Sequence, residues 1–348
     1  MEKRRLGHTN IDVSCLCLGT MMYGDQMDEA EAFAQMDACI DRGINFFDTA
    51  EMYTVPPKPE TRGHSERIVG DWIKKRGMRD RVVLASKVVG RSPMLWIREN
   101  EDETRLTRAQ IFTAIDRSLD ILQTDYLDLY QLHWPDRKIA VFGGKLNAYR
   151  HYDDDYTSYE EILDALKDIQ KAGKVRHFGL SNETPYGTMR FLQSAKDNDT
   201  PRMQSIQNAY NLLNRSFETG LAEIAIEEKI GLLAYSPMAQ GVLSGKYLNG
   251  GNPKGSRGEM YGRLNRYQTP AAEKSVKAYV DLAKELGVDP SALANQFVTT
   301  RSFVTSNIFG ARTMAQLETV WQSLEIEWTK ELDKAVDAIH AQAPNPCP

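Results

Sequence analysis

The sequence predicts an α/β fold, a (β/α)8 TIM barrel formed by a single domain over residues 1–348. Eight short apolar runs alternate with eight stretches in which apolar residues recur every three or four positions. A strand followed by a helix, repeated in this way, is typical of parallel strands joined by crossover helices. Eight such units close into a barrel more naturally than they form an open sheet. No linker or low-complexity segment divides the chain.

The predicted strands, in chain order, are CLCLG at 15–19, INFFD at 44–48, VVLASK at 82–87, YLDLYQLH at 126–133, VRHFGLSN at 175–182, SIQNAY at 205–210, IGLLAYS at 230–236 and FVTSNIFG at 303–310. The helices predicted from the apolar spacing are 28–42, 64–76, 108–122, 159–172, 184–196, 217–229, 271–287 and 313–323. Residues 3–14 are expected to form a β-hairpin that closes the barrel bottom, and 330–342 an extra C-terminal helix.

Three connections are much longer than the usual two to six residues, at about 88–106, 134–158 and 237–270. Each follows a predicted strand and precedes a predicted helix, so each belongs to the C-terminal face of the barrel. Barrel enzymes carry their active sites on this face. The functional residues are therefore expected in these loops and at the strand ends beside them.

Composition argues against several classes of protein. Lys and Arg number 43 against 48 Asp and Glu, a formal net charge of −5, and no basic run indicates a nucleic-acid partner. Cys15, Cys17, Cys39 and Cys347 have neither C-x-x-C spacing nor the density of a disulfide scaffold, which favours reduced thiols. No signal core and no stretch of about 18 apolar residues is present, so we expect no membrane contact and a cytoplasmic protein. Nothing in the sequence indicates an oligomeric state.

Successive predicted strands end in ionisable residues. Asp48 ends the second strand and is followed five positions later by Tyr53, Lys87 ends the third strand, and His133 ends the fourth. Each has an ordinary structural explanation when taken alone: a helix cap, a packing aromatic ring, a lysine extending to solvent, a hydrogen-bonded histidine. The same coincidence on three successive strands makes a shared site the better explanation.

Carbonyl reduction is the chemistry that needs this set. When a hydride reaches a carbonyl carbon, negative charge develops on oxygen, and a positioned acid must neutralise it. The phenol of Tyr53 would donate the proton, Lys87 would stabilise the phenolate and lower its pKa, and Asp48 would hold Lys87 charged. His133 would donate a hydrogen bond to the same carbonyl oxygen and orient it.

The motifs DTAEMY, SKV and YLDLYQLHWP resemble the Asp, Tyr, Lys and His tetrad of the aldo-keto reductases. The segments VSCLCLGTMMYG, GKVRHFGLSNE, QNAYNLLNR and LLAYSPMAQGVLSGKY are similar to that family in the same order, over nearly the whole chain. The resemblance implies a nicotinamide cofactor, with Tyr235 stacked under the nicotinamide and its carboxamide bound by Ser181, Asn182 and Gln207. The alternative for these residues is a helix cap and a core aromatic ring.

The Gly-rich loop after the seventh strand is where barrels often bind phosphate. Backbone N–H groups around Gly241 and Gly245, with Lys246 and Arg257, are expected to hold a pyrophosphate. The predicted cofactor site also includes the neighbouring residues Ser236, Pro237, Met238 and Leu243. GVLSGKY is not a P-loop, because its glycines are one residue too close and a tyrosine replaces the Mg²⁺-binding Ser or Thr. No G-x-G-x-x-G follows a strand, which argues against a Rossmann unit.

The segment GARTMAQLETV after the eighth strand resembles the part of the family that binds the adenosine end of the cofactor. It keeps Gly310 and Gln316 but has Val320 where the family pattern has Asn, which predicts one missing adenine contact. Arg312 would lie at a helix start that already favours an anion, and its guanidinium is suited to a 2′-phosphate. The alternative is a solvated arginine. We therefore expect NADP(H) to be preferred to NAD(H).

The sequence thus predicts an NADP(H)-dependent reductase of a small-molecule aldehyde or ketone, with no metal, and with Met22, Tyr23, Trp96 and Trp134 as candidate pocket residues. One alternative is a cofactor-bound regulatory subunit resembling the potassium-channel β subunits, which resemble this chain but carry Asn at the position of His133. A metal-dependent barrel hydrolase is a third class. It would need several His and Asp ligands at strand ends, whereas His177 lies within a predicted strand.

Overall fold

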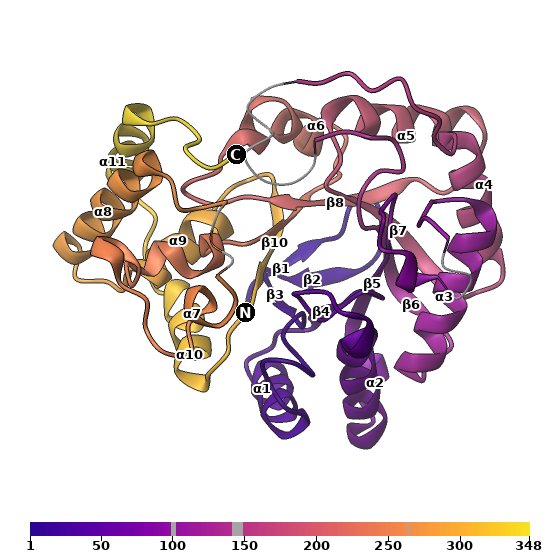
Figure 1. Cartoon of the computed structure of the whole chain (residues 1–348), viewed down its shortest axis with the longest axis horizontal. Helices are drawn as coiled ribbons and strands as arrows, with labels where there is room; N and C mark the ends of the chain where they lie inside the picture. Colours follow the sequence, from indigo (N-terminus) through magenta and orange to yellow (C-terminus); the bar gives the residue numbers. More distant parts are fainter. Residues whose placement is uncertain (99–101, 141–148, 263, 265) are drawn as a thin grey trace.

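The computed structural model describes residues 1–98, 102–140, 149–262, 264 and 266–348. Within these residues, eight parallel strands form a closed barrel in the order β10-β3-β4-β5-β6-β7-β8-β9 (Figure 1). The strands are β3 (Leu16–Gly19), β4 (Phe46–Asp48), β5 (Val83–Val88), β6 (Leu127–Leu132), β7 (Val175–Ser181), β8 (Met203–Ala209), β9 (Leu232–Tyr235) and β10 (Val304–Phe309). The predicted (β/α)8 fold is confirmed.

The predicted N-terminal hairpin is also confirmed. β1 (Lys3–Arg5) pairs antiparallel with β2 (Asp12–Ser14). The hairpin contributes Leu6 and Val13 to an apolar cluster inside the barrel, where they join Phe46, Leu129, Leu233 and other inward-facing strand residues. These buried side chains close the N-terminal end of the barrel and leave the C-terminal end for the functional residues.

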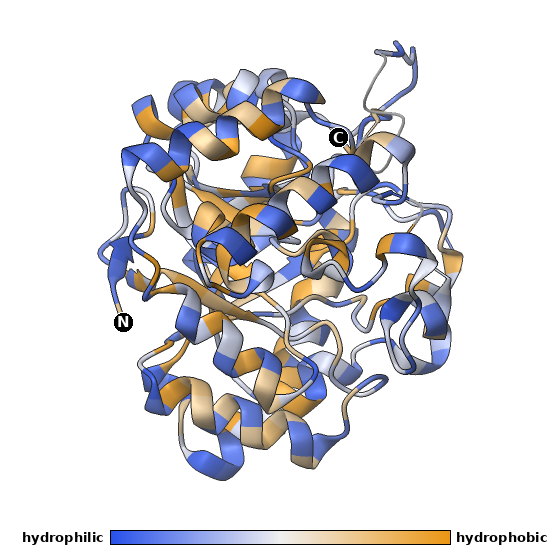
Figure 2. Cartoon of the chain, turned by 90° about the vertical axis from the view of Figure 1, so that its left-hand side faces the viewer, coloured by the Kyte–Doolittle hydropathy of each residue, from blue (hydrophilic) through white to orange (hydrophobic). Residues whose placement is uncertain are grey.

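The helices surrounding the barrel are α1 (Glu29–Asp41), α2 (His64–Arg76), α3 (Arg108–Leu122), α4 (Tyr159–Lys171), α5 (Pro185–Asp197), α6 (Leu221–Glu227), α9 (Pro290–Thr299) and α10 (Met314–Ser323). Most begin at an Asp, Ser or Thr whose side-chain oxygen accepts a backbone N–H of the first turn, as Asp28, Thr107 and Ser158 do. Their apolar faces pack on the strands and their polar faces point outward (Figure 2).

Two helix predictions need correction. Residues 217–229 contain a short 3₁₀-helix, Ser216–Thr219, followed by the shorter α6. In the described residues between position 270 and β10, the structure has two helices, α8 (Pro270–Glu285) and α9, whereas the sequence predicts one helix at 271–287. α9 packs on β10 and α10, whereas α8 lies outside it against the C-terminal helix α11 (Lys330–Gln342) (Figure 1). α9 is buried on nearly all sides, so its sequence lacks the polar face by which helices are recognised.

The loop between β9 and α8 reaches the opposite side of the barrel mouth. It contains α7 (Arg257–Tyr261), and Tyr261 Oη donates a hydrogen bond of 2.7 Å to Asp25 Oδ2 in the loop after β3. Lys58, from the loop after β4, contacts the other carboxylate oxygen of Asp25 at 3.0 Å. Three of the connections on the C-terminal face are therefore tied together at their outer edge.

The C-terminal tail folds back onto the same face. Asn345 Oδ1 accepts a hydrogen bond from Arg215 N at 2.6 Å, and Cys347 N donates to Leu213 O at 3.1 Å. All four cysteines are unpaired and buried. None of the helices in the described part of the chain is long and apolar enough to cross a membrane.

Candidate active site

The barrel mouth brings together the four ionisable residues that follow one another along the strand ends. Asp48 ends β4, Lys87 lies in β5, and His133 follows β6 directly. Tyr53 lies in the loop between β4 and α2. The rings of Tyr53 and His133 are 5.7 Å apart between centroids and meet edge to face.

Lys87 is the centre of this group. Its Nζ donates to Asp48 Oδ2 at 2.5 Å, to the backbone oxygen of Thr49 at 2.8 Å and to Tyr53 Oη at 3.1 Å. These three bonds use all the donors of an ammonium group. Burial lowers the pKa of Lys87, but Asp48 and Tyr53 together outweigh burial and raise it above the usual lysine value. Lys87 is therefore a buried, charged lysine.

The pKa of Tyr53 differs from the sequence-based expectation. Burial raises the pKa of the Tyr53 phenol, the Lys87 charge lowers it, and the net result is a pKa above the usual tyrosine value. The expected net lowering is therefore corrected: the effect of Lys87 is present, but desolvation of the phenolate is larger. The phenol is protonated at neutral pH.

His133 is neutral and directed into the site. Burial, with a smaller effect of the Lys87 charge, lowers the pKa of His133 well below the usual histidine value. Its Nδ1 is buried and has no hydrogen-bond partner among the described residues. A buried polar atom without a partner is costly, and such atoms often mark a ligand position.

Two glutamines complete the surroundings of Asp48. Its Oδ1 accepts a hydrogen bond from Gln131 Nε2 at 3.0 Å and from Gln207 Nε2 at 2.9 Å. Gln207, which was expected to bind the cofactor carboxamide, thus lies against Asp48 inside the barrel. Gln131 was missed, although it lies two residues before His133 and therefore on the same inward face of the strand.

Ser181, Asn182 and Tyr235 lie together on the far side of the mouth. Tyr235 Oη donates to Asn182 Oδ1 at 2.6 Å, and Asn182 Nδ2 donates to Ser181 Oγ at 3.1 Å and to His133 O at 2.8 Å. Ser181 Oγ donates to the backbone oxygen of Gln207 at 2.8 Å. This cluster joins β7, β8 and β9 and is continuous with His133.

The backbone after β9 adopts an unusual run of positive φ values. Ser236, Ala239 and Gln240 have φ of +58°, +47° and +59°, and Gly241 and Gly245 have φ of +92° and +79°. The N–H groups of Ala239, Gly241 and Gly245 donate within the loop to Ser236 O, Met238 O and Val242 O, at 2.9, 2.8 and 3.0 Å, so these three donors are already paired. Only the two glycines adopt these angles without steric cost.

The remaining residues predicted in this loop have mixed locations. Lys246 Nζ lies 3.2 Å from the position that a Cβ on Gly241 would take, so its ammonium is close to the strained backbone. Pro237 is buried. Met238 O accepts the N–H groups of Gly241 and Leu243 at 2.8 and 3.3 Å. The Leu243 side chain is buried in the core, so it supports the loop from below.

The predicted adenosine-end residues lie where β10 meets α10. Gly310 is exposed, and Gln316 Oε1 accepts the N–H of Arg312 at 2.8 Å. The exposed Arg312 side chain donates to the backbone oxygen of Gly255 in the loop after β9. Val320 is buried in the core.

Positive charge without acidic partners collects on this side of the mouth. Among the described residues, Lys246, Lys254, Arg266 and Arg312 form no ion pair, although ion pairs are common elsewhere on the surface. Burial lowers the pKa of Arg266, but Tyr267 and Tyr235 outweigh it, and the net pKa is raised. Arg257 is at the start of α7, next to this group. The charges of Lys246, Lys254, Arg266 and Arg312 fit a ligand that carries several phosphates.

The candidate pocket residues divide into two sets. Trp96 and Trp134 belong to an apolar cluster with Tyr53, Met52 and Ile97. Met22 is near Gly310, because its Cε lies 3.3 Å from where a Cβ on Gly310 would be. Tyr23 is fully buried, and its Oη donates to Gln35 in α1, so the expectation that it lines a pocket is wrong.

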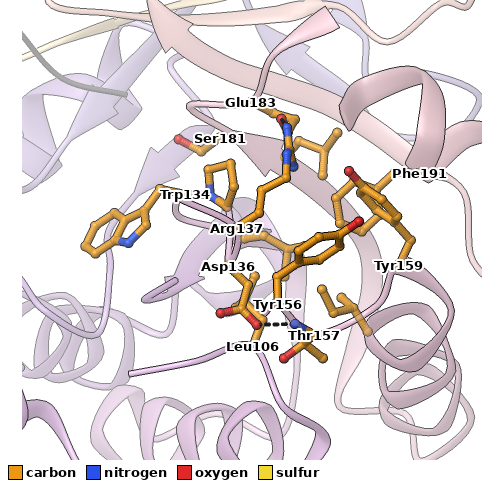
Figure 3. Close-up of a pocket in the computed structure, with 14 residues that line it drawn as sticks. Leu106, Trp134, Asp136, Arg137, Tyr156, Thr157, Tyr159, Ser181, Glu183 and Phe191 are labelled. Atoms are coloured by element: carbon orange, nitrogen blue, oxygen red, sulfur yellow. Dashed lines mark hydrogen bonds and ion pairs between the residues drawn. The ribbon is translucent and has the colours of Figure 1, made fainter. Parts of the chain in front are cut away.

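A small cavity lies behind Trp134, between the loop after β6 and helices α4 and α5 (Figure 3). The half-buried Arg137 and the buried Glu183 form an ion pair along its wall. Asp136 accepts the backbone N–H of Thr157 at 2.8 Å and contacts Arg105 at 2.6 Å. These contacts fix the loop that carries Trp134. In the described residues no group of three or more His, Cys, Asp or Glu is arranged to hold a metal ion.

Comparison with known proteins agrees with this arrangement. The model of the aldo/keto reductase family matches residues 15–341. The chain is 46% identical to Protein tas of Escherichia coli (strain K12), and the match covers all of both chains. An aldo-keto reductase of Babesia bovis is 38% identical over 75% of this chain and 96% of its own length. A probable voltage-gated potassium channel subunit beta of Arabidopsis thaliana is 28% identical over 94% of this chain and 92% of its own. The chain belongs to the aldo/keto reductase family.

Proposed function

We propose that the protein is an NADP(H)-dependent oxidoreductase that reduces an aldehyde or ketone to an alcohol, with Tyr53 as the proton donor. The observation that carries this proposal is the buried Lys87 ammonium, which contacts Asp48 at 2.5 Å and Tyr53 at 3.1 Å. A phenol hydrogen-bonded to a buried cation can lose its proton to a developing alkoxide and leave a stabilised phenolate.

Each tetrad residue then has a distinct part. Tyr53 is protonated at neutral pH, because its pKa is raised, and so holds the proton that the product needs. Lys87 stays charged and stabilises the phenolate, and Asp48 keeps Lys87 in position. His133 is neutral, because burial lowers its pKa, and it can donate an N–H to the carbonyl oxygen without taking part in proton transfer.

The residues of the mouth fit a nicotinamide dinucleotide with a 2′-phosphate. Tyr235 offers an aromatic face, and Ser181 and Asn182 offer hydroxyl and amide groups that match a carboxamide. The charges of Lys246, beside the turn at Gly241, and of Arg266, beside Tyr235, suit the pyrophosphate, and Arg312 suits the 2′-phosphate. A bound nicotinamide would supply the hydride. The unpaired, buried cysteines agree with a reducing compartment such as the cytoplasm.

A second candidate is a cofactor-bound regulatory subunit. The observation in its favour is the similarity to the Arabidopsis thaliana relative, a probable voltage-gated potassium channel subunit beta. The full tetrad of Asp48, Tyr53, Lys87 and His133 favours the enzyme, since a subunit that only senses cofactor does not need a proton donor and a carbonyl-orienting imidazole together.

The test combines cofactor binding with turnover. Fluorescence titration should give tighter binding of NADPH than of NADH, and a panel of aromatic and aliphatic aldehydes and ketones should include compounds that oxidise NADPH in the presence of the protein. Tight NADPH binding with no turnover of any carbonyl compound would favour the regulatory subunit. Failure to bind either cofactor would overturn both candidates.

A further inference from the structure

Glu51 lies between Asp48 and Tyr53 in the loop that follows β4, and its side chain points into the protein. Only 2% of the residue is exposed. Its backbone N–H donates to the backbone oxygen of Lys87 at 3.3 Å, and its Oε1 accepts the backbone N–H of Val89 at 2.7 Å. The loop that carries Tyr53 is therefore joined to the chain at two points, at Lys87 and just after the end of β5 at Val89.

Arg98 provides the counter-charge for Glu51. Arg98 Nη1 donates to Glu51 Oε2 at 2.9 Å and Arg98 Nη2 donates to Glu51 Oε1 at 3.1 Å. This is the bidentate arrangement in which a guanidinium fixes both the position and the plane of a carboxylate. Arg62 lies further away, with its Nη2 3.8 Å from Glu51 Oε2.

Arg98 also connects to α3 and follows the segment that carries Trp96. Arg98 Nε donates to Gln110 Oε1 in α3 at 3.0 Å. Immediately before Arg98 is the 3₁₀-helix Leu95–Ile97, which includes Trp96 and packs in the same apolar cluster as Tyr53 and Trp134. The Glu51–Arg98 pair thus joins the loop that carries the proton donor to the loop that forms the wall beside it.

A buried ion pair adds little net stability, because desolvating the two charges offsets their attraction. The pair does fix the position of one loop relative to the other, since both hydrogen bonds weaken when either loop shifts. A displacement of about 1 Å in a reacting group costs about 100-fold in rate. Accurate placement of Tyr53 against Lys87 is therefore the property that this pair is suited to provide.

We propose that Glu51 and Arg98 are positioning residues, which hold the Tyr53 loop against the end of β5 and set the hydroxyl of Tyr53 at its working distance from Lys87. This inference rests on the proposed function for its effect on catalysis. The tying of the two loops rests on the hydrogen bonds alone.

Asp128 provides a matched control. Its Oδ2 also accepts a strand backbone N–H, from Leu84 at 2.9 Å, and a guanidinium nitrogen, from Arg79 at 2.9 Å, and the residue is equally buried. Asp128 lies near the start of β6, at the opposite end of the barrel from the mouth. Asp128→Asn removes a comparable buried pair without touching the Tyr53 loop.

The experiment measures Glu51→Gln, Arg98→Lys and Asp128→Asn for thermal midpoint, NADPH affinity, kcat and KM with an aldehyde that the wild-type protein reduces. We expect Glu51→Gln to lose at least tenfold in kcat while its NADPH affinity stays within twofold of wild type. Arg98→Lys keeps the positive charge but cannot form the bidentate pair with Glu51, so its kcat should also fall. Asp128→Asn should lose thermal stability similarly and keep kcat within twofold. An unchanged kcat in Glu51→Gln, or equal losses of kcat in Glu51→Gln and Asp128→Asn, would overturn the positioning role.

Hydrogen exchange separates this inference from the proposed function, because it needs neither cofactor nor substrate. In Arg98→Met, the amides of Glu51 and Tyr53 should exchange faster than in wild type, while those of β6 should not change. Exchange at the wild-type rate would overturn the tie between the loops. Faster exchange in a protein that reduces no carbonyl compound would leave the tie in place and refute the proposed function alone.

Discussion

Tyr53 is the residue on which the proposed chemistry depends most directly. Tyr53→Phe removes the proton but keeps the ring that packs beside Trp96 and Trp134. We expect a loss of at least about 100-fold in kcat, the lower end of the contribution of a general acid. NADPH affinity should remain close to that of wild type, because Tyr235 and the loop after β9 are unchanged. Steady-state kinetics and a fluorescence titration measure the two effects, and ordinary turnover by the variant would remove Tyr53 from the role of proton donor.

Arg312 is the residue expected to distinguish the two cofactors. Its guanidinium is exposed at the start of α10 and has no carboxylate partner among the described residues, so its charge is available to a 2′-phosphate. Arg312→Ala should weaken NADPH binding by about 1.5 to 3 kcal/mol, the scale of a hydrogen bond to a charged group. NADH serves as the internal control. Equal weakening for both cofactors would mean that Arg312 acts only by holding the loop at Gly255.

At the residue scale, the sequence predicts the tetrad because each member ends a strand or follows one closely. Gln131, Glu51 and Arg98 could not be found in the same way. Gln131 and Glu51 are polar residues inside segments that are otherwise apolar or already assigned, and their importance appears only when Asp48 and Val89 are seen beside them. Arg98 is distant in sequence from its partner, and no periodicity connects the two.

Among the elements, α2 carries a buried acid whose titration should affect stability. Glu66 is fully buried, its Oε1 accepts a hydrogen bond from Ser86 Oγ of β5 at 2.6 Å, and burial raises its pKa to about 7. The unfolded carboxyl ionises near its ordinary value of 4.5, so the folded state binds more protons between about pH 4.5 and 7. Its contribution to stability is therefore complete below pH 4.5, falls as pH rises to 7, and is constant above 7.

Glu66→Gln removes this ionisation and keeps an acceptor for Ser86. The free energy of unfolding of the variant relative to wild type should therefore rise by about 3 kcal/mol between pH 4.5 and 7, from a shift of about 2.5 pH units. Urea titrations at pH 4.5, 6 and 7.5 measure it. A stability difference that does not vary with pH would show that Glu66 does not titrate in this range.

Element by element, strands were easier to predict than helices. Each barrel strand is short, apolar and followed by a loop with polar residues, so even its end could be located within a few residues. Helices are recognised by one polar face. α8 has such a face and was found, but it lies outside the barrel, whereas α9 lies against β10 with hardly any polar face and was missed. The spacing of apolar residues shows which helices have a face exposed to water. It does not show whether a helix packs directly on the barrel or outside another helix.

For the molecule as a whole, the two chain ends pack at opposite ends of the barrel. The N-terminal hairpin fills the bottom of the barrel, and the C-terminal tail holds the loop after β8 through Leu213 and Arg215. Deletion of residues 344–348 should leave the barrel folded but lower its thermal midpoint and weaken cofactor binding, because this loop borders Tyr235. Circular dichroism melting and NADPH titration measure these effects. Unchanged NADPH affinity would confine the tail to a stabilising role.

The hairpin has a further consequence for the order of events in turnover. Leu6, Val13 and the inward-facing strand residues fill the bottom of the barrel. Any ligand that reaches Lys87 must therefore enter and leave at the C-terminal end. Under the proposed function, Ser181, Asn182 and Tyr235 would hold the dinucleotide at the strand ends, and the carbonyl compound would bind nearer the outside, beside Trp96 and Trp134. A single entrance of this kind would make binding ordered, with the cofactor binding before the carbonyl compound and dissociating after the alcohol.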